Sequence, residues 1–173
     1  DALVCGPGLP RTLAGLPAGA RVGTSSLRRR AQMAALRPDI DVVDLRGNVD
    51  TRLARVADGV VDAPVLARAG LLRLGRAGET TQVLASPEWL PAVGQGALAL
   101  VMRSADDSSG IRGLEHADTR AATTAERSFL ARLEGGCQVP IGALATVAAG
   151  VLELHGGVFS LDGRTQLRDA LSA

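Results

Sequence analysis

Residues 21–36 read RVGTSSLRRRAQMAAL, and this stretch decides the fold. Its first four residues favour a short strand. Ser25 or Ser26 can cap a helix that runs to about Leu36, because a serine hydroxyl accepts a hydrogen bond from a free amide of the first turn. Pro38 then stops the helix. The stretch therefore predicts a strand followed directly by a helix.

The same order recurs twice further along the chain. A second strand is predicted at 41–46 with a helix at about 49–57, and a third strand at 60–66 with a short helix at about 67–74. Pro64 lies inside the third strand and cannot donate to a ladder. We therefore expect this strand at an edge of the sheet, or position 64 facing away from a partner. Alternating strands and helices predict a mostly parallel sheet with right-handed crossovers.

The second part of the chain has a different pattern. A connector rich in Gly and Pro spans 87–96. The elements expected after it are a strand at 97–102, a polar helix or loop at 106–116, a helix at 118–133 and a hairpin of 141–149 with 151–160. The predicted fold class is therefore α/β, with a parallel-sheet domain followed by a smaller α+β domain and a boundary near 92–117.

Composition narrows the functional classes. The 173 residues carry a net charge of +1, and every basic side chain is Arg. Without Lys there is no Walker-A lysine and no lysine Schiff base. Aromatic residues make up 2% of the chain, too few for stacking on nucleic-acid bases, and the two Cys and two His form no disulfide or metal pattern. No apolar run reaches the roughly 18 residues of a membrane span. We expect a cytoplasmic protein without nucleic-acid, membrane or metal partners.

Two arginines mark the first candidate site. Residues 1–76 hold twelve Arg and seven Asp, and Arg28 and Arg29 lie on the first turn of the first predicted helix. Free backbone amides at that end already attract anions. Two cations there oppose the helix dipole unless an anionic ligand lies between them. A solvated arginine pair on a surface helix is the alternative.

A second basic cluster follows the next strand and contains Arg46, Gly47 and Arg52. Adjacent parallel strands would bring it close to the first pair. Four converging guanidinium groups would repel one another unless carboxylates or phosphates paired with them. Pairing with Asp44 or Asp50 is the alternative.

Cys137 is the third candidate. It follows Gly136 in a predicted turn, which leaves the sulfur accessible. A covalent anchor is one interpretation, and a small apolar core residue is the other. A hydrolase nucleophile would need a His partner, and His116 and His155 lie outside any motif.

Several motifs occur together in one order. They are VGTSSLRR at 22–29, DLRGNVDTRL at 44–53, LPAVGQGA at 90–97, AER at 125–127 and LEGGCQVPIG at 133–142. With these motifs the chain resembles the hydroxymethylbilane synthase (porphobilinogen deaminase) family, transferases of tetrapyrrole (haem and porphyrin) biosynthesis. The resemblance is strong over about 21–142 and weaker over 143–173.

The resemblance implies a ligand and roles for these residues. Cys137 would hold a dipyrromethane cofactor through a thioether. Four porphobilinogen molecules would then be joined, with loss of ammonia, into hydroxymethylbilane. The positions that bind pyrrole carboxylates and help the amino group leave correspond to Arg28, Arg29, Arg46 and Arg52. Cofactor-binding positions beside them correspond to Thr24, Ser26 and Gly47, with Arg73 nearby.

The resemblance also implies three domains, the first two similar to periplasmic binding proteins. Residues 3–91 would form the second domain, which binds anions and substrate. Residues 92–116 would be a hinge and the returning segment of a truncated first domain. Residues 117–173 would be most of the C-terminal domain that carries the cofactor cysteine. A monomer is expected.

The sequence departs from the family in three respects. The family's catalytic aspartate and the lysine beside it would precede residue 1, the chain stops early at Ala173, and Pro64 replaces an aliphatic residue. We expect a transferase as the parent protein and an inactive 173-residue chain. A non-catalytic module that binds carboxylates or other anions is the alternative.

Overall fold

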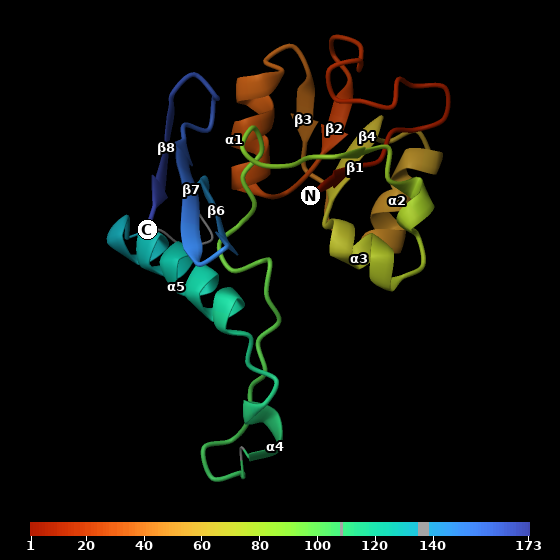
Figure 1. Cartoon of the computed structure of the whole chain (residues 1–173). Helices are drawn as coiled ribbons and strands as arrows, with labels where there is room; N and C mark the ends of the chain where they lie inside the picture. Colours follow the sequence, from red (N-terminus) through yellow and green to blue (C-terminus); the bar gives the residue numbers. More distant parts are fainter. Residues whose placement is uncertain (108, 135–138) are drawn as a thin grey trace.

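The computed structural model describes residues 1–107, 109–134 and 139–173. It has two lobes and a long arm, residues 97–116, that projects away from them (Figure 1). The first lobe contains a mixed five-stranded sheet with helices, and the second contains a three-stranded antiparallel sheet with one long helix against it. The helices and sheets of the two lobes confirm the predicted α/β class.

The strands of the first lobe lie in the order β3-β2-β4-β1-β5. Their bounds are β1 Ala2–Leu3, β2 Arg21–Gly23, β3 Asp41–Val43, β4 Ala63–Leu66 and β5 Gln82–Val83. The helices are α1 Leu27–Leu36, α2 Val49–Ala57 and α3 Arg68–Arg73, with a 3-10 turn at Ala77–Glu79. As predicted, β2 is parallel to β3 and β4, whereas β1 is antiparallel to β4 and β5. Strands β1 and β5 were not predicted, because two-residue strands leave no periodic pattern in the sequence.

Side-chain caps explain where the first two helices begin. The Ser26 hydroxyl accepts a hydrogen bond from the Arg29 amide at 3.4 Å, and Asn48 Oδ1 accepts one from the Thr51 amide at 2.8 Å. Each cap satisfies an amide that has no partner inside its helix. Both helices therefore start directly after a parallel strand, as the sequence predicted.

Aliphatic side chains cover both faces of the first sheet. One buried cluster includes Leu3, Val22, Met33, Val65 and Trp89. On the other face the buried cluster consists of Ala2, Val4, Leu53, Leu66 and Leu71. Burial of this apolar surface is the main favourable contribution to folding of this lobe.

The prediction for Pro64 as part of an edge strand is wrong. Strand β4 lies inside the sheet, with β2 on one side and β1 on the other. Pro64 still accepts a hydrogen bond from the Val4 amide at 3.2 Å through its carbonyl. One missing donor is tolerated here because β1 is short and the neighbouring ladder positions remain paired.

The second lobe consists of helix α5 (Ala117–Arg132) and strands β6 (Ile141–Ala148), β7 (Val151–Phe159) and β8 (Gln166–Ser172). The predicted hairpin is confirmed, and Ala149 and Gly150 at its tip have φ of 50° and 80°. The Phe129 ring of α5 lies against Gly156, where a Cβ would approach a ring carbon to 2.7 Å. Strand β8 was not predicted, because its residues are exposed and show no buried face.

The two lobes are in contact. Ala31, Leu90 and Phe159 form a small buried cluster across them. Arg168 of β8 donates to the carbonyls of Pro87 and Glu88 at 2.7 and 2.9 Å. The connector at 87–96 therefore lies between the lobes.

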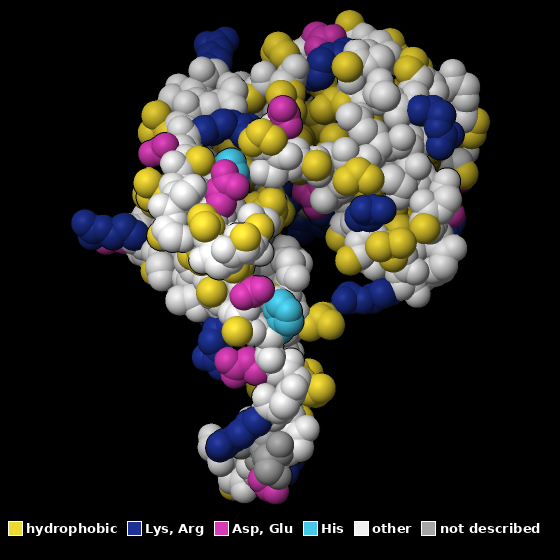
Figure 2. Space-filling view, in the orientation of Figure 1, with side chains coloured by type: hydrophobic (Ala, Val, Ile, Leu, Met, Phe, Trp, Pro, Cys, Tyr) yellow, Lys and Arg dark blue, Asp and Glu magenta, His cyan; other side chains and the backbone are white. Residues whose placement is uncertain are grey.

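The prediction of a strand at 97–102 is wrong. Within the described ranges this segment has no ladder partner, and the only regular element of the arm is α4 (Ser109–Arg112). Its apolar side chains face solvent, with Leu98 80% and Val101 92% exposed. Figure 2 shows the arm as a narrow extension below the lobes. Its sequence favours a strand, but a strand needs a neighbour to satisfy its backbone.

Candidate functional site

The loops that follow β2 and β3 lie side by side. The Thr24 amide donates to the Val43 carbonyl at 2.9 Å, and the Ser25 hydroxyl donates to the Leu45 carbonyl at 2.8 Å. Parallel neighbours place their carboxyl ends at the same edge of a sheet. The two basic clusters predicted from the sequence therefore begin at one edge.

Arg28 and Arg29 are buried at this edge. Their side chains are 8% and 12% exposed, and both donate to the Asp1 carboxylate, at 2.8 and 2.7 Å. Arg28 also donates to the Leu90 carbonyl at 2.6 Å, and Arg29 to the Val65 carbonyl at 2.9 Å. The alternative of a solvated pair on a surface helix is therefore wrong.

Two positive charges, those of Arg28 and Arg29, share one carboxylate, that of Asp1. Burial, together with the neighbouring charge of Arg29, lowers the pKa of Arg28 to about 9. Burial also lowers the pKa of Arg29, to about 10. The Nε atoms of both residues are buried and find no hydrogen-bond partner in the described part of the chain. Such orphaned donors are rare and costly, so the pair suits an additional acceptor such as a carboxylate.

Arg52 is electrostatically coupled to this pair. Its Nε donates to the Gly47 carbonyl at 2.8 Å, which holds the side chain beside the loop after β3. Burial lowers the pKa of Arg52, the charge of Arg29 lowers it further, and Asp44 opposes the change. The structure therefore brings Arg52 within electrostatic range of Arg29.

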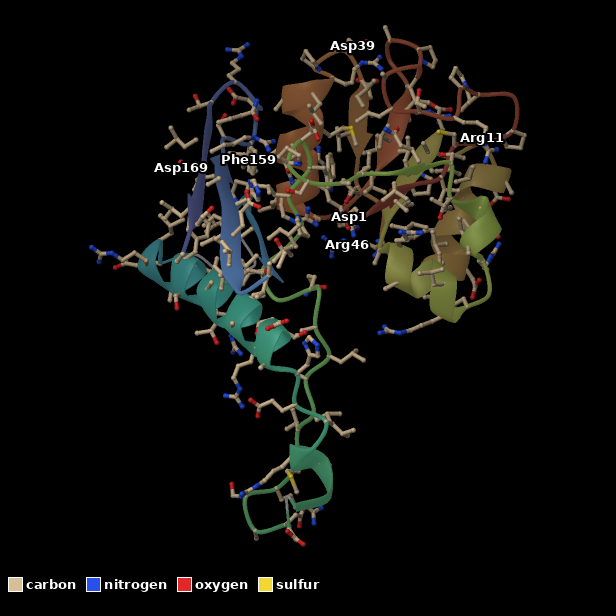
Figure 3. All side chains as sticks on the ribbon, viewed as in Figure 1. Asp1, Arg11, Asp39, Arg46, Phe159 and Asp169 are labelled. Atoms are coloured by element: carbon tan, nitrogen blue, oxygen red, sulfur yellow. The ribbon has the colours of Figure 1, made fainter. Side chains whose placement is uncertain are left out.

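Arg46 is the most exposed of the four predicted arginines. Its side chain is 83% exposed and its Nε donates to Asp44 at 3.1 Å. This pairing is the alternative that the sequence left open, whereas Asp50 pairs with Arg76. In Figure 3, Arg46 and Asp1 are labelled at the same end of the first lobe. An exposed ion pair of this kind is weak, so Arg46 can exchange Asp44 for another anion.

The predicted hydrogen-bonding residues shape the loops. Thr24 is fully buried and its hydroxyl accepts from the Ser26 amide at 3.2 Å, while Ser26 caps α1. Gly47 has φ of 110°, and a Cβ there would lie 2.8 Å from a methyl of Thr51. These three residues set the backbone from which the arginines project. Arg73 is exposed in the last turn of α3.

Cys137 lies outside the described residues. Cys5 is half-buried, its Sγ accepts from the Thr81 hydroxyl at 3.3 Å, and burial raises the pKa of its thiol. Among the described residues, no three His, Cys, Asp or Glu side chains gather as metal ligands. None of the helices in those ranges has the length and apolar character to cross a membrane.

Three residues of this network were missed by the sequence analysis. They are Asp1, which pairs with the arginines, Trp89, which donates to Asp1, and Gln32, which donates to the Leu90 carbonyl. No local pattern identifies them, because they meet only after β1 has entered the sheet beside β4.

Comparison with known proteins identifies two related regions. Residues 1–110 match the family model described as "Porphobilinogen deaminase, dipyromethane cofactor binding domain". Residues 121–172 match "Porphobilinogen deaminase, C-terminal domain". Together they cover both lobes.

Curated relatives share the same name. The chain is 54% identical over 166 residues to porphobilinogen deaminase of Roseiflexus castenholzii, covering 95% of the chain and 54% of that protein. It is 55% identical to that of Desulforudis audaxviator, covering 88% of the chain and 50% of the relative. It is 50% identical to that of Syntrophotalea carbinolica, covering 100% and 55%. The chain thus spans about half the length of these relatives.

Proposed function

The chain belongs to the porphobilinogen deaminase family, and we propose on this basis that it is part of a hydroxymethylbilane synthase. This transferase joins four porphobilinogen molecules into the linear tetrapyrrole hydroxymethylbilane and releases ammonia. The observation that carries the proposal is the buried pair Arg28 and Arg29, whose Nε donors lack partners in the described ranges.

The residues present fit a dipyrromethane cofactor. A dipyrromethane of this pathway carries acetate and propionate side chains, and planar guanidinium forks bind carboxylates with two parallel hydrogen bonds. Arg28 and Arg29 would hold the cofactor carboxylates, and Cys137 would anchor it through a thioether. When bound, the cofactor supplies the pyrrole carbon at which the chain of pyrroles grows.

The remaining residues would accommodate a growing polyanion. Each added pyrrole brings two more carboxylates. Arg52, within electrostatic range of Arg29, and the exposed Arg46 would pair with them as the chain lengthens. Thr24, Ser26 and Gly47 would keep the loops in place. A fixed set of cations that pairs with the substrate carboxylates would orient the aminomethyl group for departure as ammonia.

The domain organisation belongs to the same proposal. Residues 3–91 would be the second domain, of the kind found in periplasmic binding proteins, and 117–173 would belong to the C-terminal domain. Residues 92–116 would be a hinge and a segment that returns to the first domain. The exposed apolar side chains of the arm, Leu98, Leu100 and Val101, support this assignment, since such a surface normally packs against another part of a protein. A monomer in the cytoplasm is proposed.

Mass spectrometry of purified protein carrying this sequence tests the function. We expect a covalent adduct of two pyrrole units on Cys137, absent from a Cys137→Ser variant. Assays of porphobilinogen consumption should show turnover by a full-length deaminase that contains this sequence and bears the adduct, whereas the 173-residue chain alone is expected to be inactive. Turnover with an unmodified Cys137 would contradict the cofactor role. Binding of porphobilinogen without adduct or turnover would favour the non-catalytic anion-binding alternative.

A further inference from the structure

The Asp1 carboxylate accepts hydrogen bonds from three side chains on two segments of the chain. Its Oδ1 accepts from Arg29 Nη2 at 2.7 Å, and its Oδ2 accepts from Arg28 Nη2 and from Trp89 Nε1, each at 2.8 Å. The Asp1 side chain is only 8% exposed. A charged acceptor that is surrounded by donors and shielded from water is held in one orientation.

This carboxylate is the counter-ion of the arginine pair. Arg28 and Arg29 are adjacent and buried, so their guanidinium groups repel each other more strongly than they would in water. One carboxylate shared between them removes one of the two positive charges and aligns both forks. One net positive charge and two Nε donors remain for a ligand.

The same carboxylate ties the pair to the connector between the lobes. Trp89 is 2% exposed and donates its indole N–H to Asp1. The carbonyl of Leu90 accepts from Arg28 Nη1 at 2.6 Å and from Gln32 Nε2 at 3.0 Å. The Leu90 amide donates to Gln32 Oε1 at 2.8 Å. The connector and the arginine pair therefore belong to one hydrogen-bond network.

We propose that Asp1 is a positioning residue that holds the forks of Arg28 and Arg29 in the geometry that binds carboxylates and links this geometry to the connector at Trp89. The inference rests on the proposed function, because it requires that the arginine pair binds carboxylates. If only net charge mattered, removal of the Asp1 carboxylate would strengthen anion binding, because a negative group beside the anion site would be lost. A positioning role predicts weaker binding, because the forks lose their alignment.

The test compares the unchanged chain with Asp1→Asn and Asp39→Asn, using tricarballylate as the probe and isothermal titration calorimetry. Asp39 is the matched control, because its carboxylate also pairs with an arginine, Arg37, at 2.7 Å and both substitutions add one positive charge. Figure 3 labels Asp39 at the opposite end of the first lobe from Asp1. We expect Asp1→Asn to weaken binding about tenfold and Asp39→Asn to leave it unchanged. Equal or tighter binding by Asp1→Asn overturns the positioning role.

A second variant keeps the test decisive if Asp1→Asn does not fold. Trp89→Phe retains a buried aromatic ring, removes the indole donor and reduces the ring volume. We expect it to weaken tricarballylate binding about threefold, and unchanged affinity contradicts the link to the connector. Absence of binding by the unchanged chain would instead contradict the proposed function, and the positioning role would fall with it.

Discussion

The Ser25 hydroxyl donates a hydrogen bond of 2.8 Å to the Leu45 carbonyl, so the loop after β2 is fastened to the loop after β3. The nearby Ser25 hydroxyl and the hydrogen bond from Arg46 keep the pKa of Asp44 below its usual range. The two loops that carry the basic clusters are therefore coupled through one hydroxyl group.

Ser25→Ala removes this coupling. We expect the free energy of unfolding to fall by about 1 kcal/mol, the usual net contribution of one such hydrogen bond. Urea denaturation followed by the fluorescence of Trp89 measures it, because the chain has one Trp. A midpoint identical to that of the unchanged chain would show that the loops are held by other contacts.

Glu126 is buried to 4% exposure and fastens the connector to the second lobe. Its Oε2 accepts from the Gly94 amide at 2.6 Å and its Oε1 from the Ala145 amide at 2.9 Å. Glu126→Gln places an amide donor against one of these N–H groups. We expect a loss of about 2 kcal/mol in the free energy of unfolding.

Glu153→Gln is the matched control for this substitution. Glu153 is 51% exposed and pairs with His155 on the surface. We expect its effect on the free energy of unfolding to stay within about 0.5 kcal/mol. Equal effects of the two substitutions in urea denaturation would mean that the hydrogen bonds of Glu126 to Gly94 and Ala145 do not add to the free energy of unfolding.

Gly47→Ala tests the turn that orients the second basic cluster. Gly47 has φ of 110°, and an added Cβ would lie 2.8 and 2.9 Å from side-chain carbons of Thr51. We expect a destabilisation of roughly 2 kcal/mol. Gly78→Ala is the control, because a Cβ there meets nothing within 4 Å. Differential scanning calorimetry should show a lower Tm for the first variant only, and equal Tm values would contradict strain at Gly47.

The Cys5 thiol should resist ionisation. Burial raises its pKa above the usual 9.0, while the hydrogen bond from Thr81 and the charge of Arg11 oppose that change. The folded state then keeps its proton at a pH where the unfolded state loses it, so stability falls as pH rises above about 9. In a Cys137→Ser background, the pH dependence of alkylation should have its midpoint above 9. A midpoint below that value would contradict the burial effect.

The sequence predicted the parts of the fold that depend on local chemistry. Helix α2 begins and ends where predicted, because Asn48 caps it and Asp58-Gly59 ends it. The parallel pairing of β2 with β3 and β4 followed from the alternation of strands and helices. The insertion of β1 between β4 and β5 could not be predicted, since long-range pairing rather than local preference decides it.

The candidate site was predicted in part. The sequence predicted that four guanidinium groups converge. In the structure Arg28 and Arg29 share one carboxylate and Arg52 lies within electrostatic range of Arg29, whereas Arg46 is exposed. The sequence did not reveal that Asp1 neutralises part of their charge, because Asp1 and Arg28 are separated by 27 positions and meet only through the sheet. The sequence also could not show that Arg46 pairs with Asp44, because an arginine that pairs with a nearby carboxylate and one that binds an anionic ligand look alike in a sequence.

Carboxylate binding by the arginine pair is the claim on which the account depends. Titration calorimetry of porphobilinogen against the unchanged chain, Arg29→Gln and Arg11→Gln tests it most directly. Arg11 is exposed, and Figure 3 labels it well away from Asp1 and Arg46. We predict binding by the unchanged chain and by Arg11→Gln, with affinity at least about tenfold lower for Arg29→Gln. Equal affinity of all three proteins, or no binding by any, would contradict the account.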